Sequence, residues 1–340
     1  MSSKGVSRMS NRPLRIAING FGRIGRSVLR ILLRDRRDME VVLINDIAAL
    51  ETCAYLFEYD SVYGPWSEPV SFREQTLVVG EVSMPFYHAS DISKLDLRGV
   101  DVLLECTGHA NSRAVALRGI EAGAKRVLIS GPSAAADVTL VLGANEEAFN
   151  GQSVISNASC TTNALAPLLR IVDEEFGIIG GQMTTIHCYT ASQPTIDQPR
   201  SDLARSRAAA LSMVPTTTSA HAIVGEVLPH LAGLIEARAL RVPTASVSAI
   251  DLTVAVRHIL DLNTMRAKLK QAAEASPILG WIEKPLVSVD LRGRPESLVL
   301  SGPETSLGAG GLLRVFGWYD NEWGFSNRML DMAQYLGRMD

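Results

Sequence analysis

The stretch that most constrains the fold of this chain is a short apolar segment that runs into closely spaced glycines and then into a helical pattern. Residues 14–18 have the pattern of a strand, and residues 28–33 place apolar side chains on one helix face. Glycines between them permit a tight turn, close approach of the backbone to a pyrophosphate, and close packing of the helix on the sheet. The helix N-terminus would face the anion. This predicts a dinucleotide-binding unit whose cofactor-binding residues are Gly20, Phe21, Gly22, Arg23, Ile24 and Gly25.

A second strand, residues 40–44, ends in Asn45 and Asp46, twenty-one residues after Gly25. An acidic residue at this spacing can bind the ribose hydroxyls of the adenosine, and it would repel a 2′-phosphate. Asp46 therefore favours NAD over NADP as the cofactor. The alternative is that Asp46 is a turn residue at the end of the strand.

The rest of the first half alternates strand and helix. Residues 100–105 and 125–129 are strand candidates, residues 113–122 form a helical pattern between them, and residues 76–82 and 85–88 resemble an antiparallel insertion. Such alternation predicts an α/β fold with a Rossmann-type, doubly wound parallel sheet. Ligands collect at the carboxyl ends of such strands, so Thr107, Gly108 and Ser130 are cofactor candidates. Ordinary turn chemistry explains these residues equally well.

A cysteine begins the second half. Cys160 stands among small hydroxyl and amide residues, directly before a helical pattern that runs from Ala164 to Phe176. The partial positive charge of a helix N-terminus favours a thiolate, so the pKa of Cys160 is expected to fall below its free value. The alternative is a buried, unreactive thiol.

A cysteine nucleophile needs a base, and the next histidine along the chain is His187. Alternation around it predicts a strand that can carry the imidazole over Cys160. Further on, the hydroxyl run 216–218 and Arg241 offer the groups of a phosphate clamp, because guanidinium binds phosphate oxygens bidentately. A surface arginine is the alternative for Arg241.

Three segments together resemble the phosphorylating glyceraldehyde-3-phosphate dehydrogenase family: residues 156–163, 187–190 and 318–324. They occur in the family's order, and the resemblance runs from about Leu14 to the C-terminus. It implies that Cys160 is the nucleophile, that His187 is the base, and that Asn321 binds the nicotinamide carboxamide. It also places Thr190 and Arg241 at one phosphate subsite, and Ser159, Thr161 and Thr218 at the other.

The activity implied by this resemblance is NAD-dependent oxidative phosphorylation of glyceraldehyde 3-phosphate to 1,3-bisphosphoglycerate through a cysteine thioester. The implied partners are the triose phosphate, inorganic phosphate and three further copies of the chain in a homotetramer. Departures from the family pattern at Ala191, Ser192, Gln198 and Ser219 leave open the choice of substrate and the strictness for NAD. Erythrose-4-phosphate dehydrogenase and a non-catalytic binding protein of the same fold remain alternatives.

The expected organisation is a disordered tail at 1–13, an NAD-binding domain at 14–158, and a catalytic domain at 159–324. A C-terminal helix, 325–340, is expected to pack back on the first domain. Strand patterns at 246–256, 285–291, 297–301 and 312–319 predict a mostly antiparallel sheet in an α+β catalytic domain.

Composition excludes several classes of protein. A net charge of −3 gives no bias toward nucleic acid, and the apolar runs are too short to span a membrane. Residues 1–13 lack the apolar core of a secretion signal, so a cytoplasmic location is expected. The four cysteines, at 53, 106, 160 and 188, lack paired-ligand spacing, which predicts reduced thiols and no metal.

Overall fold

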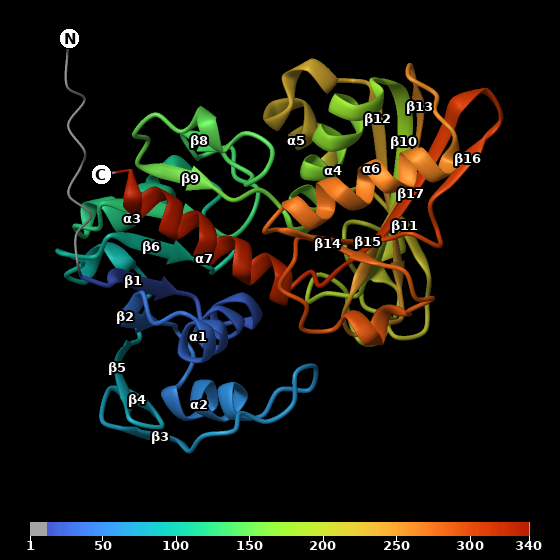
Figure 1. Cartoon of the computed structure of the whole chain (residues 1–340). Helices are drawn as coiled ribbons and strands as arrows, with labels where there is room; N and C mark the ends of the chain where they lie inside the picture. Colours follow the sequence, from blue (N-terminus) through green and yellow to red (C-terminus); the bar gives the residue numbers. More distant parts are fainter. Residues whose placement is uncertain (1–11, 340) are drawn as a thin grey trace, which may run out of the picture.

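The structure is a computed structural model, and it describes residues 12–339. The predicted disordered tail, 1–13, lies outside the described residues except for its last two positions. Two sheets with their helices lie beside each other, and the C-terminal helix runs between them (Figure 1). This arrangement agrees with the predicted α/β fold that carries a second sheet.

The first sheet has the strand order β3-β4-β5-β2-β1-β6-β7-β9-β8. All neighbours from β5 to β8 are parallel, and only β3–β4 and β4–β5 run antiparallel. The doubly wound parallel sheet and its antiparallel insertion are therefore as predicted. The strands are β1 (Leu14–Asn19), β2 (Met39–Asn45), β3 (Val70–Arg73), β4 (Thr76–Val79), β5 (Val82–Tyr87), β6 (Val102–Glu105), β7 (Arg126–Ile129), β8 (Val138–Thr139) and β9 (Val154–Ser156).

Both faces of this sheet are covered, because successive strand residues point to opposite sides. Ile16 and Ile18 of β1 join the core beneath α1 (Arg23–Asp35), α2 (Leu50–Glu58) and α7 (Trp323–Arg338). Ala17, between them, joins the core on the other face, beneath α3 (Arg113–Glu121). Residues at the carboxyl ends of β1, β2 and β6 line one cavity, and in a doubly wound sheet this is where a dinucleotide would bind.

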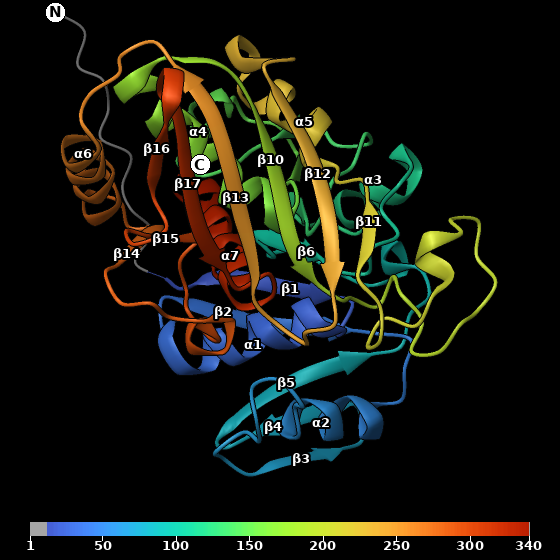
Figure 2. The ribbon, with the colours of Figure 1, turned by 90° about the vertical axis from the view of Figure 1, so that its right-hand side faces the viewer.

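The second sheet has the order β11-β12-β10-β13-β17-β15-β14, with β16 paired to β17. It is mixed: β10–β12 and β14–β15 are parallel, and its other pairs are antiparallel (Figure 2). The strands are β10 (Ile178–Cys188), β11 (Val214–Thr216), β12 (Ile235–Val242), β13 (Ser248–Val256), β14 (Leu279–Ile282), β15 (Leu298–Ser301), β16 (Ser306–Gly308) and β17 (Leu312–Tyr319).

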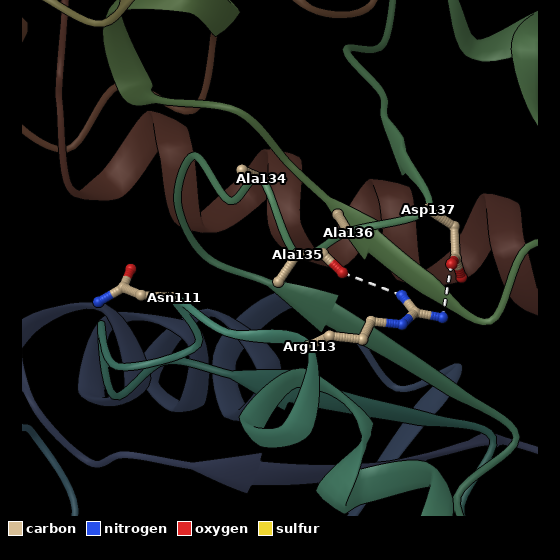
Figure 3. A pocket seen from close by; sticks show the side chains of 6 residues that line it. All are labelled: Asn111, Arg113, Ala134, Ala135, Ala136 and Asp137. Carbon is tan, nitrogen blue, oxygen red and sulfur yellow. Dashed lines mark hydrogen bonds and ion pairs between the residues drawn. The ribbon is translucent and has the colours of Figure 1, made fainter.

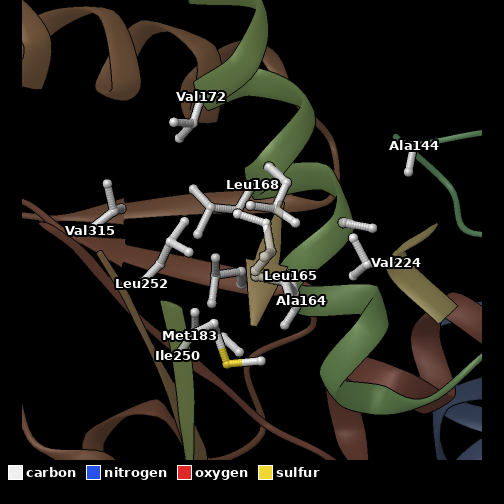
Figure 4. Packing of buried hydrophobic residues seen from close by; sticks show 14 of the residues in the cluster. Ala144, Ala164, Leu165, Leu168, Val172, Met183, Val224, Ile250, Leu252 and Val315 are labelled. Carbon is white, nitrogen blue, oxygen red and sulfur yellow. The ribbon is translucent and has the colours of Figure 1, made fainter. Parts of the chain in front are cut away.

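One face of the second sheet is packed against α4 (Cys160–Phe176), α5 (Ala220–Val227) and α6 (Leu262–Ala275). Leu165 and Leu168 of α4 point toward Leu252 and Val315 of the sheet (Figure 4). Fully burying each leucine contributes about 1.5–3 kcal/mol, which anchors α4 against this face of the sheet.

The strand expected at 285–291 does not form, and this prediction was wrong. The segment instead ends in a 3-10 turn, η5 (Ser288–Leu291). Pro285 cannot donate to a sheet ladder, and Asp290 accepts a hydrogen bond from Val287 N at 2.9 Å, which closes the chain locally. Four other short 3-10 helices lie in loops of the described chain: η1 (Ile92–Lys94), η2 (Glu146–Ala148), η3 (Ala204–Ser206) and η4 (Pro229–Leu231). A further one, η6 (Ala309–Gly311), is distorted at Gly310 and precedes β17.

The C-terminal helix α7 packs against α1, and its apolar side chains belong to the core of the first sheet. It therefore leaves the second sheet through the loop after β17 and returns to the first. Within residues 12–339, no helix combines the length and apolarity needed to cross a membrane.

Candidate active site

Cys160 and His187 meet where α4 and β10 come together. Cys160 is the first residue of α4, and His187 is the penultimate residue of β10. The Cys160 Sγ and His187 Nε2 atoms are 3.6 Å apart, within hydrogen-bonding distance for sulfur. The fold therefore brings together a thiol and an imidazole that are twenty-seven residues apart in sequence.

The first turn of α4 is held by side chains next to Cys160. Ser159 Oγ accepts a hydrogen bond from Thr162 N at 3.1 Å, the usual arrangement of a serine N-cap. Asn163 Nδ2 donates to the carbonyls of Asn157 and Ser159. Ala158 has a φ of 55°, a left-handed conformation that costs a non-glycine residue about 1 kcal/mol or more. The surrounding bonds must therefore hold this turn, and with it the thiol, in place.

The predicted lowering of the Cys160 pKa is wrong for this structure. Burial raises the pKa of the thiol, and the positive charge of Arg241 and hydrogen bonds from Thr161 offset this only in part. The loss of solvation penalises the thiolate more than Arg241 and the hydrogen bonds at the start of α4 stabilise it. Cys160 is therefore a neutral thiol at neutral pH.

His187 is buried and also neutral. Burial and the nearby charge of Arg241 lower its pKa to about 4, although the carbonyl of Cys188 acts in the opposite direction. His187 Nδ1 lies 2.7 Å from Cys188 O, so the proton of the neutral ring belongs on Nδ1, which donates to that carbonyl. The Nε2 lone pair then faces the Cys160 thiol, ready to accept its proton.

Arg241 lies directly beside His187, because β12 pairs in parallel with β10 and puts the two residues in register. Its Nη1 atom donates to Cys188 O at 3.1 Å and to Thr190 Oγ1 at 3.4 Å, and lies 3.0 Å from His187 Nδ1. Thr190 Oγ1 is also 2.9 Å from Ser192 Oγ. The structure therefore brings Arg241 and Thr190 together beside the thiol–imidazole pair.

The three residues expected at the other phosphate subsite are less clearly assembled. Ser159 caps α4, and Thr161 Oγ1 is buried 3.0 Å from Tyr319 Oη. Thr218 Oγ1 accepts a hydrogen bond from Ala220 N at 3.2 Å, just before α5. Within residues 12–339, no hydrogen bond joins Thr218 to Ser159 or Thr161.

A cavity of about 410 Å³ lies at the carboxyl ends of β1, β2 and β6. Gly20, Gly22, Asp46 and Thr107 are among the residues that line it. Gly20 has a φ of 94°, and a Cβ there would meet the backbone of Thr107 at 2.7 Å. At Gly22, the N-cap of α1, a Cβ would meet nothing within 4 Å, so there is open space in front of a helix N-terminus without a side-chain cap. This cradle fits the pyrophosphate of a dinucleotide.

Asp46 faces the same cavity and is held in place by the glycine turn. Its carboxylate accepts hydrogen bonds from Phe21 N at 2.6 Å and Ala48 N at 2.8 Å. Two oxygens offer about four acceptor sites, so capacity remains for ribose hydroxyls.

Other residues of the predicted cofactor set serve the fold through their side chains. Phe21 packs against Phe57 in the core, and Arg23 forms ion pairs with Asp60 and, at 2.5 Å, with Glu322. Gly25 allows close packing, because a Cβ there would lie 2.2 Å from Gly20 O. Ile24 packs against the core, and Gly108 and Ser130 are outside the lining of the 410 Å³ cavity.

A buried polar network beneath the cavity was missed by the sequence reasoning. Asn19 Nδ2 donates to Glu105 Oε2 at 2.5 Å, Asn45 Nδ2 donates to Asn19 Oδ1 at 2.8 Å, and Thr107 N donates to Glu105 Oε1 at 3.0 Å. The signal was present, since Asn19, Asn45 and Glu105 are polar residues that each end a strand directly after apolar residues. The network ties the three strand ends together and fixes the floor of the cavity.

The loop after β17 carries Asn321. Its backbone is held by Asp320, whose carboxylate accepts from Tyr63 Oη at 2.9 Å, Trp323 N at 2.9 Å and Gly293 N at 2.8 Å. These bonds connect the loop after α2, the loop before β15 and the start of α7. Asn321 is thereby positioned at the junction of the two sheets.

A second cavity, of about 490 Å³, contains none of the predicted site residues (Figure 3). It is lined by Arg113, Asn111 and residues 134–137. Arg113 lies 2.7 Å from the Asp137 carboxylate and donates to Ala135 O at 2.9 Å. Its charge is already neutralised, so this cavity offers no free cation to an anionic ligand.

A dinucleotide cradle at the strand ends of the first sheet, with a thiol–imidazole pair beside the second, is the arrangement of an NAD-dependent dehydrogenase. Residues 14–113 match the glyceraldehyde 3-phosphate dehydrogenase NAD binding domain, and residues 159–321 match the C-terminal domain of the same family. The chain belongs to the glyceraldehyde-3-phosphate dehydrogenase family.

Curated relatives agree over almost the full length. The chain is 45% identical over 332 residues to glyceraldehyde-3-phosphate dehydrogenase of Xanthobacter flavus, covering 96% of this chain and 99% of that protein. It is 44% identical over 328 residues to the Pseudomonas aeruginosa enzyme, covering 95% and 98%. It is 42% identical over 331 residues to glyceraldehyde-3-phosphate dehydrogenase 1 of Bacillus subtilis, covering 96% and 98%.

Proposed function

We propose that this protein oxidises glyceraldehyde 3-phosphate to 1,3-bisphosphoglycerate with NAD and inorganic phosphate. The observation that carries the proposal is the 3.6 Å contact of Cys160 Sγ with the neutral His187 Nε2, beside Arg241. A thiol and a base at this distance can form and break a covalent bond to an aldehyde carbon. The family match supplies the class of aldehyde.

His187 moves the protons in the proposed reaction. It takes the thiol proton from Cys160 as Sγ adds to the aldehyde carbon, and it returns that proton to the carbonyl oxygen to give a hemithioacetal. It then accepts the hydroxyl proton as the carbon is oxidised to a thioester. NAD, when bound, supplies the hydride acceptor for this step. A phosphate oxygen then attacks the thioester carbon, and the thiolate of Cys160 leaves and recovers a proton from His187.

Two anion subsites belong to this proposal. Arg241 and Thr190 bind the phosphate of the substrate, which is supported by their contact beside His187. Ser159, Thr161 and Thr218 bind inorganic phosphate, which is supported by the family resemblance and by the placement of Ser159 and Thr161 on either side of Cys160. Gly20, Gly22, Asp46, Thr107 and Asn321 bind NAD, with the other predicted cofactor residues (Phe21, Arg23, Ile24, Gly25, Gly108 and Ser130) completing its surroundings.

We also propose the domain division 14–158 and 159–324, with 325–340 returning to the first domain, and a cytoplasmic homotetramer. The packing of α7 on α1 supports the division. The connection between β10 and β11 projects from the sheet (Figure 2). It supports assembly, because it exposes large apolar side chains. These are Ile196, Leu203, Leu211 and Met213.

A spectrophotometric assay of NADH formation tests the main proposal. We expect rapid, phosphate-dependent reduction of NAD with glyceraldehyde 3-phosphate and slower reduction with erythrose 4-phosphate. Faster turnover of the tetrose would establish the sister activity instead. A protein that binds NAD but reduces none with either aldehyde would be a non-catalytic member of the family.

Arg241→Ala is expected to lower kcat/KM for glyceraldehyde 3-phosphate by roughly 2–5 kcal/mol, the cost of truncating a desolvated charge pair. Unphosphorylated glyceraldehyde should lose much less, because it has no phosphate for Arg241 to bind and is affected only through the lost contacts of Arg241 with His187, Cys188 O and Thr190. The measurement is kcat/KM for both aldehydes. Arg238→Ala, an exposed change on the same strand, is the matched control. Equal losses on both aldehydes would rule out a phosphate-binding role for Arg241.

Asp46→Ala is expected to lower the preference for NAD over NADP by roughly tenfold or more, on the scale of 1.5–3 kcal/mol for hydrogen bonds to a charged group. The carboxylate that accepts ribose hydroxyls and repels the 2′-phosphate is lost. The ratio of kcat/KM for the two cofactors measures the effect, with Glu40→Ala, an exposed change on the preceding strand β2, as the control. An unchanged ratio would make Asp46 a turn residue only.

A further inference from the structure

Two hydrogen-bond donors contact the side-chain oxygen of Asn321. Cys188 Sγ lies 3.1 Å from Asn321 Oδ1, and Ser248 Oγ lies 3.4 Å from the same oxygen. Cys188 ends β10 and Ser248 begins β13, so adjacent strands present both groups to the loop after β17. All three residues are buried, and only 7% of the surface of Asn321 is exposed to solvent. Neither the thiol of Cys188 nor the hydroxyl of Ser248 has a part in the proposed proton transfers.

The chemistry of each group fixes the direction of these bonds. Ser248 Oγ already accepts a hydrogen bond from Cys188 N at 3.2 Å, which leaves its own hydrogen free for Asn321. Burial raises the pKa of the Cys188 thiol to about 12, so the thiol keeps its proton and donates as well. Of the two amide atoms of Asn321, only Oδ1 can accept both hydrogens.

The amide nitrogen of Asn321 is consequently directed away from Cys188 and Ser248. Nδ2 has no hydrogen-bond partner within the part of the chain that the structure describes, residues 12–339. The backbone around Asn321 is held by the bonds of Asp320 to Glu322 N and Trp323 N. With the backbone held in this way, the two donors to Oδ1 oppose a 180° rotation of the side-chain amide.

We propose that Cys188 and Ser248 are positioning residues that present the Asn321 amide N–H groups to the carboxamide oxygen of the nicotinamide. The inference rests on the proposed function, which places the nicotinamide against Asn321. Without the two donors, the amide can turn and offer its oxygen to an oxygen of the ligand, an arrangement of two acceptors. The pair thus sets which carboxamide atom the site recognises.

Calorimetric titration of the full-length protein with NAD and with ADP-ribose, which lacks the nicotinamide, tests the proposal. In Cys188→Ala, the Kd for NAD should rise roughly threefold to tenfold, as expected for loss of one buried hydrogen bond, while the Kd for ADP-ribose changes less than about twofold. Cys188→Ser keeps a donor and should restore most of the NAD affinity. The double variant Cys188→Ala/Ser248→Ala should approach Asn321→Ala.

The ratio of the two dissociation constants within one variant does not depend on the fraction of folded protein, so a partial loss of stability cannot imitate the effect. Equal weakening of NAD and ADP-ribose, or an unchanged NAD Kd in Cys188→Ala, would overturn the positioning role and leave the proposed function intact. Wild-type protein that binds ADP-ribose and NAD with the same affinity would overturn the nicotinamide contact itself. Absence of NAD binding to the wild type would overturn both this inference and the proposed function.

Discussion

Cys160→Ser is expected to reduce dehydrogenase turnover by roughly a thousandfold or more while NAD binding stays close to that of the wild type. Serine differs from cysteine only in having oxygen in place of sulfur, but its hydroxyl is far less acidic and a weaker nucleophile. The pKa of the cysteine is already raised by burial, so the reaction depends on proton transfer to His187 during the attack. A hydroxyl proton is much harder to remove by a base whose pKa is about 4.

Two measurements check this result. Steady-state NADH formation gives the loss of turnover, and titration with NAD shows whether the cofactor site is preserved. Cys53→Ala is the control, because Cys53 is a buried thiol on α2 whose pKa burial raises to about 11. It should keep near-normal activity. Turnover of Cys160→Ser within tenfold of the wild type would contradict the covalent mechanism.

His187→Asn is expected to lower kcat/KM by roughly a hundredfold to ten-thousandfold, the usual contribution of general acid–base catalysis. The pH dependence should change as well. With a pKa of about 4, His187 remains an unprotonated base throughout the range above pH 5, so its protonation should not depress the wild-type rate near pH 6.5.

In the His187→Asn variant, Cys160 must ionise without a base. Burial raises the pKa of the thiol above that of a free cysteine, so the rate should rise about tenfold per pH unit across the neutral range. Single-turnover oxidation across pH 5–9 measures both profiles. A variant whose profile has the shape of the wild-type profile would show that another group is the base. His230→Asn, an exposed histidine paired with Asp173, is the control.

Local features of the chain were predictable because they depend on neighbours a few residues away. The helix that begins at Cys160 follows from the Ser159 N-cap and from apolar residues at helical spacing. The glycine turn at Gly20 and the acidic residue at Asp46 follow from spacing along two consecutive strands. The strand expected at 285–291 failed for an equally local reason, since Pro285 and Asp290 close a turn that the alternation of apolar residues concealed.

The properties of the site itself depend on contacts between distant segments. The register of β10 with β12 places Arg241 beside His187, and the two residues are fifty-four positions apart. Burial by surrounding segments reverses the expected direction of the Cys160 pKa. The floor of the cofactor cavity needs three strand ends, at Asn19, Asn45 and Glu105, to meet before any of their hydrogen bonds can exist.

By itself, the sequence determined the two kinds of sheet, the dinucleotide turn, and the identity of the thiol and imidazole. The spacing of hydrophobic residues, the spacing of glycines and the chemistry of single residues are all properties of short segments. Only the tertiary structure decided the 3.6 Å distance between Cys160 and His187, the neutral state of both, and the orientation of the Asn321 amide by Cys188 and Ser248. Distance, desolvation and hydrogen-bond direction are set by residues brought together from two strands, a helix and the loop after β17. No stretch of the chain contains that information before it folds.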